Sequence, residues 1–296
     1  MEPLVSVIIN CYNGEKYLRE AIDSVINQKY QNWEIIFWDN NSTDGSLEVC
    51  KKFSDPRIKI FTSEKHTLLY KARNYAIAKS SGQYLSFLDV DDAWLPNKLV
   101  DQIPLFSDPG VGCVYGNYFI VNEVKKRKWL AYRELPSGYI TNELIKNYKV
   151  GILTLVIKRS IILNEESIFN GDYHIIGDYD AVIRLSLKTK IVPTLDPVAL
   201  YRIHGQNEFG KSRALYLDEM KSWVNSTGNL PEIRKLSNYP LLSMQINYIK
   251  AVNNLLSGNR IEAIKIASRG LNLKSAIKIF FVSVLPKKII VYLKNN

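Results

Sequence analysis

Carboxylates stand at alternate and adjacent positions in the segment Asp89-Val90-Asp91-Asp92, directly after a short apolar run. One carboxylate of such a cluster can accept hydrogen bonds from sugar hydroxyls while another binds a divalent cation. Oxygen ligands at a partly open site suit Mg²⁺ or Mn²⁺, which then bridges to a substrate diphosphate. An acidic loop that caps the next helix gives the same pattern, because Asp is frequent at helix N-termini. The cluster alone leaves both interpretations open.

The position of this cluster is set by the strands that precede it. Short, β-branched apolar runs predict buried strands at residues 5–9, 33–38, 58–61 and 84–88. Polar clusters follow three of these runs, at residues 10–13, 39–42 and 89–92. In a parallel sheet the carboxyl ends of the strands share one edge, where ligands bind. We therefore expect the three clusters to converge on one site.

Helical patterns separate the predicted strands. Apolar residues recur at helical spacing from Tyr17 to Ile26, and a further helix is expected around residues 70–79. Ser42 is in position to cap the helix that carries Leu47 and Cys50. Alternating strands and helices predict an α/β fold, a Rossmann-like and mostly parallel sheet.

The second half of the chain is more mixed. A charged turn is expected at residues 125–128, further strands at 152–157 and 191–194, and helices from 212 onward. Residues 241–256 and 261–271 have the pattern of a helical hairpin. We expect a catalytic domain over residues 1–210, with a nucleotide half at about 1–100 and an acceptor half at about 101–210. A helical C-terminal region is expected over 211–296.

Composition limits the class of protein. The 296 residues are 46% hydrophobic and 23% charged, as in ordinary globular proteins. The cysteines Cys11, Cys50 and Cys113 form no CxxC pair, which argues against a disulfide framework or a structural zinc site. No basic n-region precedes the first apolar run, and no stretch of about 18 apolar residues occurs. We expect a cytoplasmic location without a membrane-spanning helix.

Longer segments resemble a known family. VSVIINCYNGEKYLREAIDSVINQKYQNWEIIFWDNNSTDGS and ARNYAIAKSSGQYLSFLDVDDAWLPNKL are similar to family 2 glycosyltransferases, which have the GT-A fold. The similarity continues through GDYDAVIRLS and YRIHGQN, in the family's order and spacing. Co-linear motifs are far more specific than one DxD sequence. The resemblance implies an inverting transferase with a nucleotide-sugar donor and a divalent cation, Mn²⁺ or Mg²⁺.

The resemblance also implies roles in donor binding. Tyr12 matches the family tyrosine that lies against the nucleotide base. Asn40 stands where the family has the second Asp of VDDGSTD, which accepts from a uracil N–H; an amide oxygen can still accept, so a UDP-sugar is favoured. Asp89 and Asp91 match the DxD pair, with Asp89 at the ribose and Asp91 on the metal. Asp92 is expected to be structural.

The later motifs imply the catalytic groups. Asp178 matches the general base of the family's Glu-Asp pair, although Gly177 replaces the Glu. Asp180 is the alternative base, or an acid favoured by the helix dipole. His204 matches a histidine near the diphosphate and metal. Arg73 can contact the donor or form a surface ion pair.

The C-terminal segment is basic. Of the net charge of +10, residues 263–296 contribute +7 without any acidic residue. Within it an apolar stripe recurs at helical spacing, formed by Ile277, Phe280, Phe281, Val284 and Leu285. Such a stripe packs in a core or lies on an anionic membrane surface, and the flanking lysines favour the membrane. No nucleic-acid-binding motif accompanies the charge.

These observations predict an enzyme that transfers a sugar to a glycan, in particular a lipid-linked precursor of a surface polysaccharide. We expect it at the inner face of the membrane as a peripheral protein. The alternative is a non-catalytic, membrane-docked scaffold of the same fold that binds nucleotide. A nucleotidyltransferase would need a Gly-rich, basic phosphate loop after the first strand, and residues 10–15 do not form one.

Overall fold

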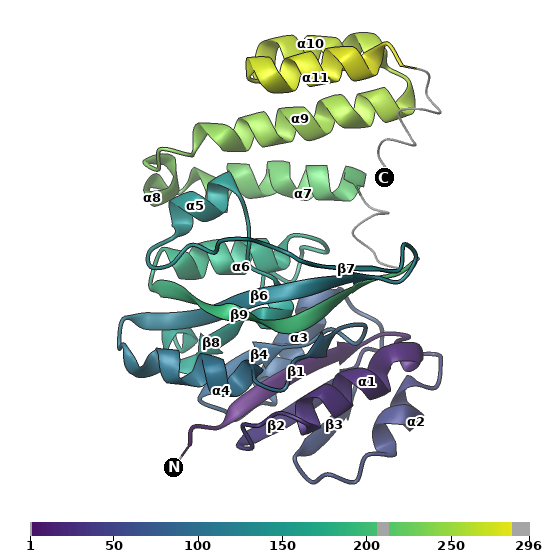
Figure 1. Ribbon diagram of the computed structural model, residues 1–296, viewed down its shortest axis with the longest axis vertical. Helices are drawn as coiled ribbons and strands as arrows, with labels where there is room; N and C mark the ends of the chain where they lie inside the picture. Colours follow the sequence, from purple (N-terminus) through teal and green to yellow (C-terminus); the bar gives the residue numbers. More distant parts are fainter. Residues whose placement is uncertain (1, 206–212, 286–296) are drawn as a thin grey trace. The chain divides into compact units, whose positions relative to one another are not determined.

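The computed structural model describes residues 2–205 and 213–285 (Figure 1). The chain divides into two compact units, one of residues 1–141 and 148–207 and one of residues 142–147 and 208–296. The predicted boundary near residue 210 lies outside the described residues, as do Gln206 and Asn207 of the YRIHGQN motif and the basic residues beyond 285. Among the described residues, no helix is both long and apolar enough to span a membrane.

The first part of the sheet unit is a parallel βαβ arrangement, as predicted. Its strands pair in the order β3-β2-β1-β4, all in parallel. The strands are β1 (Val5–Cys11), β2 (Trp33–Asp39), β3 (Ile58–Thr62) and β4 (Tyr84–Phe87). The helices between them are α1 (Glu15–Ile26), α2 (Ser46–Lys51) and α3 (Leu69–Ala78).

The sheet continues as β8-β6-β9-β5 with mixed directions. Here β6 and β9 run parallel along most of their length, whereas β8 is antiparallel to both β4 and β6. The added strands are β5 (Ala93–Trp94), β6 (Val111–Asn122), β7 (Arg127–Leu130), β8 (Val156–Lys158) and β9 (Lys190–Ile203). The helical segments are α4 (Lys98–Gln102), η1 (Ile103–Ser107), η2 (Ile152–Thr154), η3 (Arg159–Ile162) and α6 (Gly177–Ser186). The predicted α/β class with a mostly parallel sheet is confirmed.

Both faces of the central strands are buried, since every residue of β1 and β2 is buried; Figure 1 shows α1 in front of the sheet and α3 behind it. Alternate residues of β1 and the apolar side of α1 are fully buried together, among them Val7, Ile9, Leu18 and Ile22. The period of two along the strand and of about 3.6 along the helix places these residues on facing sides. The burial fixes the register of β1, and with it the positions of the residues at its carboxyl end.

Two sequence expectations are wrong in detail. Ser42 does not cap α2, which has Gly45 at its N-cap; the amide of Ser46 is bound instead by Asp44 Oδ1 at 3.1 Å. The Ser42 hydroxyl accepts a hydrogen bond from the amide of Asn13 at 3.0 Å and so joins two strand-end loops. The segment at 152–157 is also not one strand, because a 3₁₀ turn occupies its first half.

The second unit is helical, as predicted for the described part of the C-terminal region. It contains α5 (Thr141–Lys146), α7 (Arg213–Asn225), η5 (Thr227–Asn229), α8 (Pro231–Arg234), α9 (Pro240–Ser257), α10 (Arg260–Gly270) and α11 (Leu273–Ser283). The expected hairpin of α9 and α10 is present, and it turns at Gly258, whose φ of 95° favours glycine. Ala251, Leu255, Ala263, Ala267 and Ile279 form its small core.

Candidate active site

The loops after β1, β2 and β4 meet at the carboxyl edge of the sheet, as the strand pattern predicts. Asn13 joins the first two loops, because its Oδ1 accepts from the amide of Thr43 at 2.8 Å. Gly14 lies against the third loop: a Cβ at this position would come within 2.6 Å of Val90. Residue 14 must therefore be glycine for the loop that carries Asp89 and Asp91 to lie where it does.

Asp89 lies at this edge in an ion pair with Arg73 of α3. The Arg73 side chain is 3% exposed, whereas the Asp89 side chain is 32% exposed. Arg73 is thus in a buried ion pair and not in the surface ion pair that the sequence left open. Since a buried charge needs a partner, Arg73 and Asp89 hold each other in place and leave part of the carboxylate open to a ligand.

Asp91 pairs with His204 across the site. Asp91 Oδ2 lies 3.0 Å from Nε2 of His204, and both side chains remain partly exposed. Burial and the charge of Asp89 raise the pKa of the Asp91 carboxyl, while His204 opposes that shift. A carboxylate oxygen and an imidazole nitrogen therefore converge at a point with excess negative charge.

Asp92 points away from this opening into the protein. It is 3% exposed, and its Oδ1 accepts the backbone N–H of Arg202 at 2.9 Å. Burial and the neighbouring Asp91 and Asp89 raise its pKa well above the usual range. This geometry fits the structural role that the sequence suggests for Asp92.

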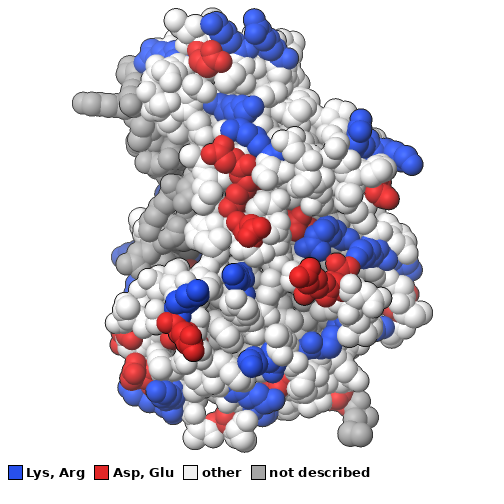
Figure 2. All heavy atoms as spheres, turned by 180° about the vertical axis from the view of Figure 1, so that it is seen from behind, with Lys and Arg blue, Asp and Glu red and all other residues white. Residues whose placement is uncertain are grey.

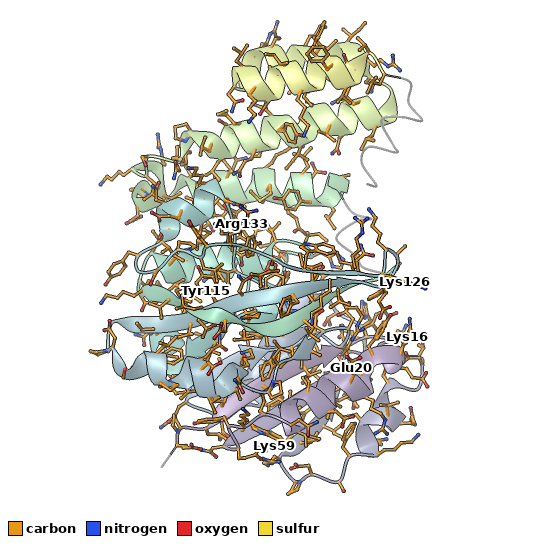
Figure 3. All side chains as sticks on the ribbon, in the orientation of Figure 1. Lys16, Glu20, Lys59, Tyr115, Lys126 and Arg133 are labelled. Atoms are coloured by element: carbon orange, nitrogen blue, oxygen red, sulfur yellow. The ribbon has the colours of Figure 1, made fainter. Side chains whose placement is uncertain are left out.

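Arg202 fixes the acidic loop to β9, and sequence reasoning did not single it out. Its Nε–H donates to the carbonyl of Asp91 at 2.9 Å. The guanidinium also reaches Glu123 at 2.8 Å and Glu20 at 2.7 Å; Figure 3 labels Glu20 on α1. The available signal was its place in the YRIHGQN motif, two residues before His204 and at the end of β9.

Asp178 stands in the first turn of α6 and is half-buried. Its Oδ1 accepts from the hydroxyl of Tyr70 at 3.1 Å and from the amide of Tyr179 at 2.8 Å. Burial raises the pKa of the carboxyl, while the nearby charge of Arg73 and these two hydrogen bonds counteract the shift. Arg73 and Asp89 both act electrostatically on Asp178, which places it in the same site as the strand-end cluster.

Gly177 explains how Tyr70 reaches Asp178. A Cβ on residue 177 would overlap the Tyr70 ring, so glycine provides the space that the ring fills. Tyr70 is 4% exposed and precedes Arg73 by three residues, which puts the two on one side of α3. That spacing is the sequence signal by which Tyr70 could have been found.

Asp180, the alternative base, has a different environment. It is 2% exposed, and its Oδ2 lies 3.0 Å from Nε of Arg184, one turn along α6. Burial and the contact with Arg184 leave this carboxylate little surface for a substrate, whereas Asp178 is partly exposed. The geometry favours Asp178 over Asp180 as the base.

Tyr12 and Asn40, the side chains predicted to bind the nucleotide base, follow β1 and β2 at the same edge. Tyr12 is 49% exposed, and its ring lies 4.0 Å from that of His66. Asn40 is buried; its amide donates to the carbonyl of Thr67 at 2.8 Å and its oxygen accepts from the Thr67 amide at 3.2 Å. Asn40 thus holds the loop that presents His66 to Tyr12, a contact that no sequence pattern indicated.

One buried carboxylate at this edge is only partly satisfied. Asp39 is 4% exposed, and its Oδ2 accepts from the amide of Ser42 at 3.2 Å. Its Oδ1 has no hydrogen-bond partner within the described part of the chain. Leaving a buried acceptor unpaired is unfavourable, and such groups are frequent at functional sites.

The sequence-predicted residues therefore come together in two groups. Asp89, Arg73, Asp91, His204 and Asp178 are linked by contact or charge, and Tyr12 and Asn40 are linked through His66. Within the described ranges no set of three His, Cys, Asp or Glu side chains forms a complete metal cage. Asp91 and His204 are nevertheless ligand types that suit a divalent cation whose other ligands come from a substrate.

The comparisons with known proteins identify the class. Residues 6–163 match the model of "Glycosyl transferase family 2", which is more than half of the chain, and the chain belongs to this family. It is 38% identical over 160 residues to the Escherichia coli UDP-Glc:alpha-D-GlcNAc-diphosphoundecaprenol beta-1,3-glucosyltransferase WfgD, covering 54% of this chain and 62% of WfgD. It is 30% identical to the putative teichuronic acid biosynthesis glycosyltransferase TuaG of Bacillus subtilis, covering 53% of this chain and 63% of TuaG. Both matches span less than two thirds of the relative.

Solved structures show the same fold. TarS of S. aureus, crystallised in complex with UDP-GlcNAc, superposes with a TM-score of 0.64 at 16% identity, over 94% of this chain and 86% of the other. The mannosyltransferase PcManGT of Pyrobaculum calidifontis, in complex with GDP-Man and Mn²⁺, superposes with a TM-score of 0.65 at 15% identity, over 95% and 79%. These similarities confirm the GT-A fold, with helices following the sheet domain.

Proposed function

We propose that this chain is an inverting glycosyltransferase that moves a sugar from a UDP-sugar to a hydroxyl of a lipid-linked GlcNAc diphosphate. WfgD, by its name, uses UDP-Glc and a GlcNAc-diphospholipid, and UDP-glucose is the donor that this similarity favours. The intact acidic residues support an enzyme over a nucleotide-binding scaffold. The observation that carries the proposal is that Asp178 accepts a hydrogen bond from Tyr70, one turn of α3 from the Arg73 that pairs with Asp89. Arg73 and Asp89 both act electrostatically on Asp178.

Asp178 is the proposed general base. Its raised pKa favours proton uptake, whereas its hydrogen bonds from Tyr70 and Tyr179 hold the carboxylate in a fixed orientation. Asp178 takes the proton of the acceptor hydroxyl as that oxygen forms a bond to the anomeric carbon. The bond from that carbon to the diphosphate oxygen breaks in the same displacement, so the configuration inverts and UDP leaves.

Tyr12, Asn40, Asp89 and Arg73 are the proposed donor-binding residues. The exposed Tyr12 ring, supported by His66, offers an aromatic face to the base. Asn40 would act on the base directly or through the loop that it anchors at Thr67. The half-open carboxylate of Asp89, fixed by Arg73, suits the hydroxyls of a ribose.

Asp91 and His204 are the residues that would hold a divalent cation, Mn²⁺ or Mg²⁺. The fit rests on the 3.0 Å separation of Asp91 Oδ2 and His204 Nε2 and on the nearby carboxylate of Asp89, whose charge acts on Asp91. When bound, the cation supplies neutralisation of the diphosphate leaving group. Arg202 would keep Asp91 in place for this task through the Asp91 carbonyl.

The proposed catalytic domain covers residues 1–210, with the nucleotide half at about 1–100 and the acceptor half at about 101–210. We place the enzyme at the inner face of the membrane as a peripheral protein, because a lipid-linked acceptor would be confined to that surface. The helical region from residue 211 onward would make the membrane contact.

A transfer assay tests the proposal. A panel of UDP- and GDP-sugars is offered with Mn²⁺ and a short-chain GlcNAc-diphospholipid, and products are identified by mass spectrometry and by the NMR coupling of the anomeric proton. We expect transfer from a UDP-sugar with inverted configuration, abolished by chelator. Retained configuration, or transfer only from GDP-sugars, would overturn the proposal.

A further inference from the structure

Helix α11 has a buried side, an exposed apolar side and an exposed basic edge. Ile279 and Ser283 face the core of the helical unit and are buried. On another side Leu273, Ile277, Phe280, Phe281 and Val284 are exposed, between 45% and 76% each. The structure thus shows that most of the stripe predicted from sequence is not core. At 3.6 residues per turn these residues fall on one arc about 100° wide.

Lysines border this arc. Lys274 and Lys278 each follow a residue of the exposed stripe, which places them along one edge of it, and both are exposed. The neighbouring α10 adds the exposed Lys265 and Arg269. Figure 2 shows Lys and Arg side chains over these helices, with an acidic group among them, and the exposed Glu262 stands in the first turn of α10. Long basic side chains at the border of an apolar face can reach phosphate groups while their stems stay in the apolar layer.

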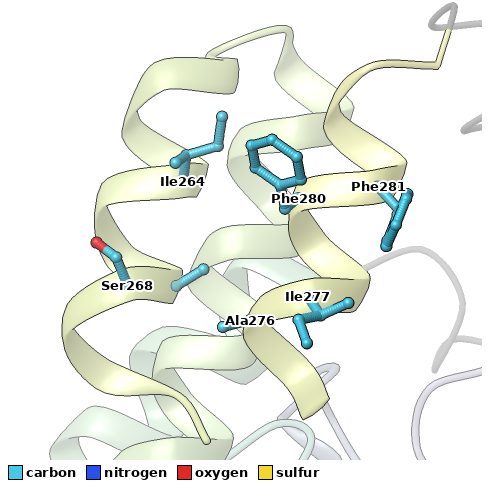
Figure 4. Close-up of a pocket in the computed structure, with 7 residues that line it drawn as sticks. Ile264, Ser268, Ala276, Ile277, Phe280 and Phe281 are labelled. Atoms are coloured by element: carbon cyan, nitrogen blue, oxygen red, sulfur yellow. The ribbon is translucent and has the colours of Figure 1, made fainter. Parts of the chain in front are cut away.

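An apolar groove lies beside the stripe. Ile264 and Ala267 of α10 and Ala276 and Phe280 of α11 line a groove of about 270 Å³. In Figure 4, Ile264 and Phe280 point toward one another across it, while Phe281 points away. The wall is almost entirely hydrocarbon, so it offers an acyl chain contacts but offers a polar ligand no hydrogen bonds.

We infer that this face of α10 and α11, the stripe with its lysine border and groove, docks on an anionic lipid bilayer. The inference rests on the proposed function in one respect: docking would hold the enzyme at the membrane surface that carries its lipid-linked acceptor. The charge complementarity carries it: no acidic residue occurs from 263 to 296, and the exposed apolar arc is continuous. A second copy of the chain would bring lysines of like charge together, which disfavours a self-association face.

Vesicle flotation of the full chain tests the inference, with vesicles of phosphatidylcholine alone or with phosphatidylglycerol. We expect binding to the anionic vesicles. The partition coefficient should be about tenfold lower on neutral vesicles, which lack the anionic charge, and in about 0.5 M salt, which screens it. Phe280→Ser with Phe281→Ser, and Lys274→Glu with Lys278→Glu, should each lower the partition coefficient about tenfold or more. The matched controls Leu195→Ser and Lys51→Glu with Lys52→Glu alter exposed residues of the sheet unit and should bind like wild type.

UDP release to water, measured without vesicles, separates the two proposals. Both α11 variants should release UDP at the wild-type rate, so a loss of docking cannot be mistaken for a failed active site. Equal vesicle binding by wild type and both variants would overturn the inference. So would a lipid-independent dimer in sedimentation that the phenylalanine variant dissociates. If that variant unfolds, the lysine variant decides, because its changes remove no packed side chain.

Discussion

The two ends of the same strands treat their buried polar groups in opposite ways. At the amino end of β2, the carboxylate of Glu34 accepts from Ser6, from the amide and hydroxyl of Ser81, and from Lys59, which Figure 3 labels. Burial opposes ionisation of Glu34, but these donors outweigh it and lower its pKa to about 2. This end is a satisfied network that stabilises the fold.

At the carboxyl end of the strands, burial outweighs the hydrogen bonds that favour the ionised carboxylates. Asp91, Asp92 and Asp178 all have raised pKa values, first because of burial and, for Asp91 and Asp92, then because of their acidic neighbours. Asp39 keeps one oxygen without a partner among the described residues. The comparison teaches that one sheet can hold carboxylates for stability at one end and keep others at a cost in stability at the other, where the proposed substrate and cation would bind them.

The largest effect is expected at Asp178. Asp178→Asn should lower turnover by about 10³-fold or more, because the proton acceptor is lost in the transition state, with donor affinity nearly unchanged. A carboxyl whose folded pKa is raised loses its stabilising contribution as pH rises, so at pH 7 the amide should not lower the melting temperature. Asp180→Asn is the matched variant; if it is the inactive one, the base is Asp180.

The next effect concerns the cation ligands. Asp91→Asn should lower turnover by about 10²-fold and make activity depend on higher Mn²⁺ concentration, since a charged ligand is replaced by a weaker neutral one. Asp101→Asn, an exposed acid on α4, is the control. An Asp91 variant with the wild-type metal requirement would remove Asp91 from the metal site.

A substitution at the amino end of the strands should lower the free energy of unfolding and leave catalysis unchanged. Glu34→Gln should cost about 2 kcal/mol in unfolding free energy, because the ion pair with Lys59 is lost and an amide NH₂ replaces the oxygen that accepts from it, while the Michaelis constant for donor stays unchanged. The pKa of Glu34 is depressed in the fold, so its contribution is present above about 4.5 and lost as pH falls toward about 2. Urea denaturation at pH 7 and pH 3 measures both points. A variant as stable as wild type at pH 7 would break the comparison between the two ends.

A smaller effect is expected at Tyr70. The Tyr70 hydroxyl lowers the pKa of Asp178, so Tyr70→Phe should move the acid limb of the pH–rate profile to higher pH and cut turnover a few-fold at pH 7. Tyr75→Phe, a change of the same size on α3, should leave the profile in place. An unshifted profile for Tyr70→Phe would mean that Tyr70 only fills the space beside Gly177.

Much of the fold follows from local patterns. The β-branched runs, the helical periods between them and the polar residues at strand ends predict the parallel half of the sheet and its functional edge. The antiparallel strand β8 begins where a 3₁₀ turn interrupts an apolar run, and composition alone does not show that turn. The role of Ser42 was also not predictable, because its partner Asn13 lies 29 residues away.

In the candidate site, too, some features follow from local sequence patterns and others from contacts between distant segments. The residues proposed to contact the substrate lie in recognisable motifs, whereas those that position them act through tertiary contacts. The contact of Arg202 with the Asp91 carbonyl and that of His66 with Tyr12 join segments far apart in the sequence, and Arg73 pairs with Asp89 of another strand end. The sequence did not decide whether the apolar stripe of α11 is buried or exposed, because helical periodicity predicts an apolar face but not what packs against it.

Calorimetric titration of UDP tests most directly whether the carboxyl edge of the sheet is a metal-dependent donor site. UDP is titrated into the wild-type chain and into Asp91→Asn, with Mn²⁺ and with chelator. We predict one saturable binding event in Mn²⁺, weakened about tenfold or more both by chelator and by the substitution. UDP binding of equal strength in all four titrations, or no binding in Mn²⁺, would contradict the account.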